Sequence, residues 1–119
     1  MSKYVNILAS AARTTLQSVD VDSAGYRGVR VFMDTTVDPA SASITPSLYT
    51  VDPQTGVELL LLAGDAVAAV GDTTYTVYPG IAAEANVSAN TVLGHILRVK
   101  VAVADTDSMT YQMTAEFLK

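Results

Sequence analysis

The chain has 119 residues, enough for one domain with a single core. Half of them are hydrophobic, only 16% are charged, and the formal net charge is −5. This balance argues against a nucleic-acid partner, because phosphate binding needs a dense Lys/Arg surface. The absence of cysteine excludes disulfides, thiolate metal sites and cysteine catalysis. So few charges favour a surface that is partly covered in an assembly.

The start of the chain does not have the pattern of a signal peptide. Met1-Ser2-Lys3 is followed by mixed polar and apolar residues. The apolar run Leu59–Ala63 is too short to cross a bilayer. We therefore expect a protein made in the cytoplasm, with no membrane partner.

The first half of the chain predicts extended structure. Residues 4–14 (YVNILASAART) fit an extended arm or a strand better than a short helix, and residues 15–22 alternate only loosely. Residues 28–37 (GVRVFMDTTV) place Val29, Val31 and Met33 on one face of a strand that Asp38-Pro39 ends. Residues 44–51 (ITPSLYTV) form a strand that Pro46 interrupts, which implies a sheet edge or a bulge.

The segment Asp52-Pro53-Gln54-Thr55-Gly56 predicts a tight turn, because aspartate accepts local backbone bonds and glycine adopts a left-handed conformation. Residues 57–63 (VELLLLA) follow as a strand that is apolar on both faces. This pattern indicates either a central strand covered on both sides or a strand near a partner.

Gly71-Asp72 predicts a further turn before the strand YTVYPG, residues 75–80. Tyr75 and Tyr78 fall on opposite faces of that strand, so one is expected in the core and they cannot form one sugar platform together. The exposed tyrosine favours a protein interface, where this residue type is enriched. Residues 81–93 form either a long surface loop or a short helical turn, and the length of this segment makes it a candidate for a partner contact.

The C-terminal part has the clearest alternation. Leu97, Val99, Val101 and Val103 share one face of a strand over residues 96–104. Residues 109–117 alternate in the same way, with Met109, Tyr111, Met113, Ala115 and Phe117 pointing inward. The polar turn 105–108 between them predicts a C-terminal hairpin.

In total, seven to eight short strands predict a single-domain, all-β antiparallel β-sandwich, either jelly-roll or immunoglobulin-like. Residues 1–13 are expected to be an extended N-terminal arm that takes part in assembly, by adding to a neighbour's sheet or lying on a shell.

No motif predicts catalysis, a metal or a cofactor. His95 is the only histidine and is expected on a surface or interface. Asp20-Val21-Asp22 and Asp105-Thr106-Asp107 do not continue into a calcium loop, so they are interpreted as turn residues. Gly25-Tyr-Arg-Gly28 precedes a strand and is therefore not a nucleotide-binding loop. It is expected to turn the chain and display Tyr26 and Arg27. Arg27 and Arg30 are interpreted as solvated side chains or as partners for acids on another protein.

The chain resembles small structural proteins of tailed bacteriophages. The resemblance covers almost the whole chain and rests on three stretches: NILASAARTTLQS, then YRGVRVFMDTT with ITPSLYTVDPQTGVELLLLAGDAV, and then residues 73–118 with their YPG loop. It implies a non-enzymatic virion component, with decoration of the capsid surface as the first expectation. A place in the tail, neck or baseplate, and a carbohydrate-binding module for host attachment, are the alternatives.

The expected partners are the major capsid protein or other virion proteins, together with further copies of the chain, a trimer included. The residues proposed for the partner interface are Tyr4, Val5, Ile7, Leu8, Arg27, Arg30, Tyr78 and His95.

Overall fold

The computed structural model describes residues 3–38, 42–105 and 107–119. Nine strands are present in this part of the chain, and all except the two-residue β7 are six to eleven residues long. They are β1 (Lys3–Arg13), β2 (Gln17–Asp22), β3 (Gly28–Val37), β4 (Ile44–Val51), β5 (Glu58–Ala63), β6 (Gly71–Val77), β7 (Ser88–Ala89), β8 (Ile96–Val103) and β9 (Met109–Leu118).

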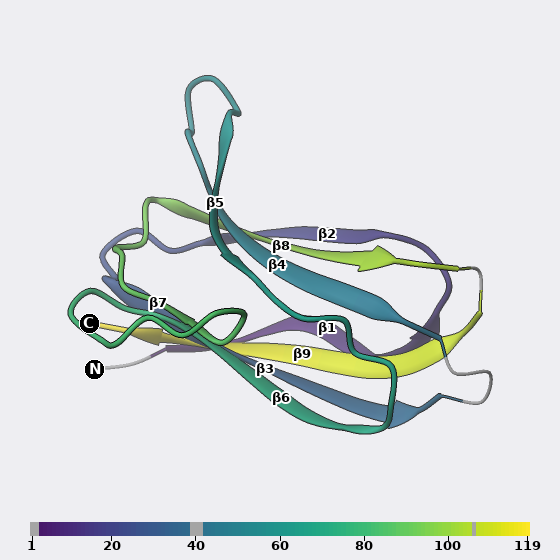
Figure 1. Cartoon of the computed structure of the whole chain (residues 1–119). Helices are drawn as coiled ribbons and strands as arrows, with labels where there is room; N and C mark the ends of the chain where they lie inside the picture. The colour runs from purple at the N-terminus through teal and green to yellow at the C-terminus, as the bar shows by residue number, and fades with distance from the viewer. Residues whose placement is uncertain (1–2, 39–41, 106) are drawn as a thin grey trace.

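The strands form two facing sheets, which Figure 1 shows as a lower and an upper layer. The first sheet has the order β1-β9-β3-β6-β7, and the second has the order β2-β8-β4-β5. All strand pairs are antiparallel except the short β6–β7 pair. The expected all-β sandwich is therefore confirmed.

The connectivity distinguishes between the two sandwich types that the sequence left open. Apart from β4–β5 and β6–β7, each strand is followed by one in the opposite sheet. Without the two-residue β7, four strands lie in each sheet, in the orders 1-9-3-6 and 2-8-4-5. This winding of eight strands through two sheets is the jelly-roll arrangement.

The core lies between the sheets and consists of the side chains that period-2 alternation predicts to point inward. Val29, Val31 and Met33 of β3 are at most 1% exposed, as are the core-facing residues of β8 and β9. Those residues are Leu97, Val99 and Val101 on β8, and Met109, Tyr111, Met113, Ala115 and Phe117 on β9. Of the two tyrosines in YTVYPG, Tyr75 is the buried one.

The predicted C-terminal hairpin is wrong. β8 belongs to the second sheet and β9 to the first, so the connection between them crosses from one layer to the other. β9 instead lies between β1 and β3. Alternation describes which face of a strand is buried but not which strand lies beside it. Of the connecting turn, Thr106 lies outside the described residues, and the Asp105 carboxylate accepts a 3.0 Å bond from the backbone N–H of Asp107.

Pro46 does not mark a sheet edge, because β4 lies between β8 and β5. The Pro46 carbonyl accepts a bond from the backbone N–H of Gly64, just beyond the end of β5. In an antiparallel ladder, the N and O of one residue point to the same neighbour. The missing N–H of Pro46 therefore faces the end of β5, and the ladder with β8 loses no bond.

Residues 3–13 do not project as a free arm, contrary to expectation. They form the edge strand β1, which pairs along its length with β9 of the same chain. Ile7 is only 7% exposed, and Val5 and Leu8 pack against the core. These three apolar side chains therefore attach β1 to the sandwich, while Met1 and Ser2 of the expected arm lie outside the described residues.

Residues 81–93 are a surface loop, interrupted only by the two residues of β7. The Glu84 carbonyl accepts 3.0 Å bonds from the backbone N–H groups of Val87 and Ser88, which close a tight turn in which Asn86 takes a positive φ of 64°. No helix is assigned within residues 81–93. The part of the chain that the structure describes also contains no helix long and apolar enough to cross a membrane.

Candidate functional site

Four of the eight residues proposed for a partner interface come together at one end of the first sheet. Tyr4 on β1, Glu116 on β9 and Arg30 on β3 occupy directly opposed positions across neighbouring strands. Their side chains therefore share the outer face of the sheet. We call the surface formed by Tyr4, Arg27, Arg30, Tyr78 and Glu116 the tyrosine–arginine patch.

Glu116 links the two sides of the tyrosine–arginine patch. The Tyr4 hydroxyl donates a 3.1 Å hydrogen bond to one carboxylate oxygen of Glu116. The other oxygen lies 3.7 Å from the Arg30 guanidinium. The hydrogen bond to this carboxylate raises the pKa of Tyr4. Tyr4 is 68% exposed and the Arg30 side chain 45% exposed, so both remain open to a partner.

Tyr78 lies at the end of β6, where its hydroxyl donates a 2.7 Å hydrogen bond to the carbonyl of Lys119. The Arg27 guanidinium is 5.7 Å from the centre of the Tyr78 ring, within the range of a cation–π contact. A shallow hollow of about 400 Å³ lies beside these residues and is also lined by Ile81 and Leu118. Tyrosine and arginine surrounding such a hollow are residue types typical of protein interfaces.

The other four proposed interface residues lie elsewhere. Ile7 is buried in the core, and Val5 and Leu8 are partly buried against it, so these three residues lie away from the tyrosine–arginine patch. His95 lies beside the β4–β5 hairpin, where its carbonyl accepts a 2.9 Å bond from the backbone N–H of Ser23. Sequence reasoning missed Glu116, whose only signal was its place on the outward face of the last strand.

A second surface is formed by β5 and the hairpin that connects it to β4. The predicted turn is confirmed: the Asp52 carboxylate accepts bonds from the backbone N–H of Gln54 and the hydroxyl of Thr55, both at 2.9 Å. These bonds lower the pKa of Asp52. Gly56 takes a φ of +76°, which favours glycine. Figure 1 shows the hairpin rising above the upper layer.

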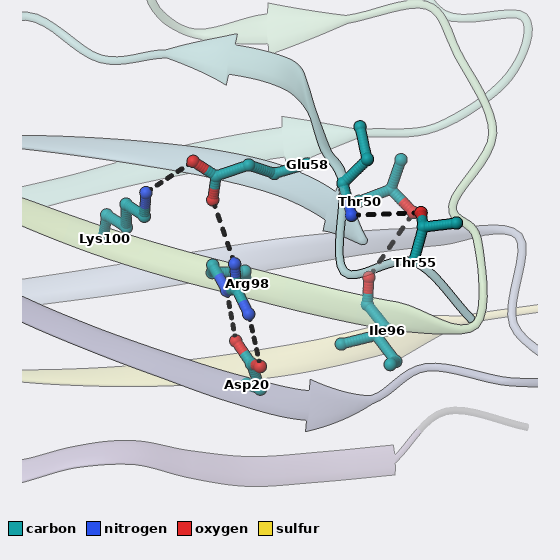
Figure 2. A network of polar contacts seen from close by, with 8 residues as sticks. Asp20, Thr50, Thr55, Glu58, Ile96, Arg98 and Lys100 are labelled. Atoms are coloured by element: carbon teal, nitrogen blue, oxygen red, sulfur yellow. Dashed lines mark hydrogen bonds and ion pairs between the residues drawn. The ribbon is translucent and has the colours of Figure 1, made fainter. Parts of the chain in front are cut away.

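The root of this hairpin is held by ion pairs across the outer face of the second sheet, drawn in Figure 2. The Glu58 carboxylate reaches over β4 to Lys100 at 2.6 Å and Arg98 at 3.1 Å. Arg98 also binds both carboxylate oxygens of Asp20 on β2, at 2.7 and 2.9 Å. These cations lower the pKa of Asp20 and of Glu58. One network thus connects β2, β8 and β5.

The interpretation of Asp20-Val21-Asp22 as turn residues is wrong for Asp20 and Val21, which lie within β2 and pair with β8. Asp20 belongs to the ion-pair network, whereas the Asp22 carboxylate accepts a 3.0 Å bond from the backbone N–H of Ala24 at a turn where Gly25 has a φ of +87°. Within residues 3–38, 42–105 and 107–119, no group of three or more His, Asp or Glu side chains is placed to hold a metal ion.

Comparisons with known proteins support a fold but not a family. No family model and no curated protein matches the sequence. A chain from the crystal structure of the T13 IBDV viral particle matches with a TM-score of 0.58 at 9% identity, covering 99% of this chain and 31% of that one. A chain from the infectious bursal disease virus Gx strain matches with a TM-score of 0.48 at 11% identity, covering 99% of this chain and 33% of that one.

This chain therefore spans about a third of the length of those chains. At such low identity the first match shows a shared fold alone. The class that the structure defines is a jelly-roll β-sandwich of a kind also found in a chain of a virus particle.

Proposed function

We propose that this protein is a non-enzymatic structural component of a bacteriophage virion. Its role in this proposal is to decorate and stabilise the capsid surface through contacts with the major capsid protein. The jelly-roll topology supports the proposal, since this architecture recurs in capsid proteins. Fold likeness alone is an analogy, because one fold serves many functions. The resemblance to phage structural proteins is a second, independent line of support.

The observation that carries the proposal is the tyrosine–arginine patch. Tyr4 and Arg30 are exposed, and Glu116 accepts a hydrogen bond from Tyr4 and forms a 3.7 Å ion pair with Arg30. Both side chains are therefore presented together on the outer face of the first sheet. Tyrosine and arginine are also the residues on which interface energies concentrate. We assign the contact with the capsid shell to this patch.

The experiment is a binding assay with purified capsid shells that lack the protein. Wild-type protein is added and the bound fraction is measured after sedimentation of the shells. Tyr4→Ala and Arg30→Ala are expected to reduce binding at least tenfold, as substitutions at hot spots do. Leu16→Ala, at a residue 57% exposed outside the patch, is the control and should bind normally. Normal binding by both patch variants would refute the assignment.

A place in the tail, neck or baseplate is the alternative within the same class. The shell assay separates the two, because a tail or neck component would not sediment with shells. The two tyrosines of residues 75–80 do not support the carbohydrate-binding alternative. Tyr75 is buried and Tyr78 lies outside the core, so the two rings do not form one exposed sugar-binding surface.

A further inference from the structure

Four of the seven lysine and arginine side chains lie at one end of the sandwich. Arg30 faces outward on β3, and Arg27 directly precedes that strand. Lys3 begins β1 beside the last residues of β9, which Lys119 follows. Figure 1 shows the start of β1 and the end of β9 side by side at this end. We call the surface formed by Lys3, Arg27, Arg30 and Lys119 the basic end.

Aromatic rings lie beside three of these cations. The Lys3 and Lys119 ammonium groups are 5.3 Å and 5.6 Å from the centre of the Tyr26 ring. The Arg27 guanidinium lies over Tyr78, as described above. Arg27 is exposed, whereas Tyr26 is partly buried against the core. Because the faces of aromatic rings attract cations, these contacts keep the positive charges together at this end of the molecule.

Only one cation of the basic end has an acidic partner among the described residues. The Arg30 guanidinium lies 3.7 Å from the Glu116 carboxylate. Lys3, Arg27 and Lys119 form no ion pair within that part of the chain. Unpaired like charges repel one another, so their concentration here disfavours the isolated chain.

Cations on the second sheet are treated differently. Arg98 and Lys100 form ion pairs with Asp20 and Glu58, at distances of 2.6, 2.7 and 3.1 Å. The whole chain has twelve acidic residues for seven cations. Unpaired cations gathered within so acidic a chain indicate a surface for a negatively charged partner, since charges across an interface are complementary.

The hollow of about 400 Å³ described above lies within this surface. Its lining combines Arg30 and Lys119 of the basic end with the apolar residues Ile81 and Leu118. A glutamate side chain has the matching composition. Its methylene groups can pack on the apolar atoms, and its carboxylate can accept charge-assisted hydrogen bonds from a guanidinium or ammonium group.

We propose that the basic end binds the carboxylates of an acidic segment of a partner protein. This inference rests on the proposed function, in which the partner is the shell protein, and it names the chemistry of that contact. A nucleic acid fits less well, because phosphate binding needs a dense basic surface and the many acids on the rest of this chain repel a long polyanion. A short acidic segment reaches the basic end without approaching those acids.

The test is a titration of the isotope-labelled protein with a short oligoglutamate peptide, followed by the shifts of its backbone amide resonances. The shifts are expected at residues 3–4, 26–30 and 116–119. Binding should weaken roughly tenfold between about 20 mM and about 500 mM NaCl, because salt screens exposed charges. Oligoglutamine of the same length should cause no shifts. The absence of shifts with oligoglutamate, or equal shifts with both peptides, would overturn the proposal.

Two charge reversals locate the site. Arg27→Glu should weaken oligoglutamate binding at least about fivefold, because it removes one exposed ion pair and adds a repulsion. Lys100→Glu is the matched control: it changes the net charge equally, but on the second sheet, and should leave binding unchanged. Equal losses in both variants would mean that net charge alone attracts the peptide, and would contradict a site at the basic end.

Other occupants of the basic end are outcomes of the same experiment. Tighter binding of a single-stranded oligothymidylate than of oligoglutamate would assign the site to nucleic acid and overturn the proposal. Self-association of the protein alone at low salt, measured by light scattering and lost in Arg27→Glu, would assign the site to a second copy and would also overturn it.

The peptide titration uses no virus particles, so its failure is distinct from failure of the proposed capsid role. If wild-type protein binds capsid shells but not oligoglutamate, the inference is refuted and the proposed function stands. If oligoglutamate binds at the basic end but shells do not, the carboxylate specificity stands and the proposed function is refuted.

Discussion

Tyr111 provides a sharp test of the core, because its hydroxyl is buried without a partner. The residue is 0% exposed, and its hydroxyl has no hydrogen-bond partner among the described residues. Burial raises its pKa. The ring itself is well supported, with the Arg13 guanidinium 4.8 Å from the ring centre. Tyr111→Phe removes only the hydroxyl and keeps this packing.

An unpaired buried polar group costs about 1–3 kcal/mol. Tyr111→Phe is therefore expected to raise the free energy of unfolding by about 1 kcal/mol. For a domain of this size that corresponds to an increase of about 3–5 °C in Tm. In urea, with a slope of about 2 kcal/mol per molar, the midpoint should rise by about 0.5 M. Equilibrium unfolding followed by circular dichroism measures both quantities.

Tyr78→Phe is the matched control for Tyr111→Phe. The Tyr78 hydroxyl donates a hydrogen bond to the Lys119 carbonyl, so its removal should lower stability or leave it unchanged. A loss of stability in Tyr111→Phe would refute the reasoning, because it would mean that the buried hydroxyl has a bonding partner after all.

Three further predictions concern the first sheet. Asp34 lies opposite Asp72, and the hydrogen bond between the two carboxyl groups raises the pKa of Asp34. A raised pKa in the folded state means that this contact stabilises at low pH and that the benefit is lost as pH rises through that pKa. Asp34→Asn should therefore gain stability relative to wild type at neutral pH but not at pH 3, by urea titration at both pH values. Gly28→Ala would bring a Cβ against the Tyr78 ring and the Val77 carbonyl, and should cost about 1–3 kcal/mol in thermal unfolding. Deletion of residues 1–12 removes most of β1 and should lower Tm strongly; an unchanged Tm would show that β1 is dispensable.

Local alternation predicted the inward face of the three strands with the clearest pattern. The inward sets of residues 28–37, 96–104 and 109–117 are those that the structure buries, because the period of a strand depends only on its own backbone. Strand neighbours follow from contacts between distant residues, such as Lys3 opposite Phe117, and no local pattern encodes them. The predicted hairpin of β8 and β9 failed for this reason.

In the candidate site, too, the sequence predicted individual residues but not which of them lie side by side. Tyr4, Arg27, Arg30 and Tyr78 were predicted as interface residues one by one, but their meeting around Glu116 depends on the order β1-β9-β3-β6. Val5, Ile7 and Leu8 were expected to be free, because an edge strand and a free arm have the same extended, partly apolar sequence. The apolar faces of β5 left two alternatives open, a central strand or a strand near a partner. β5 is an edge strand, so the first alternative is wrong and the second stays a prediction.

The most direct test of the capsid role is the position and copy number of this protein in purified particles, determined by cryo-electron microscopy. The account predicts many symmetry-related copies on the outer surface of the head, with the tyrosine–arginine patch against the shell. A few copies confined to the neck or tail, or no copies in the particle, would contradict it.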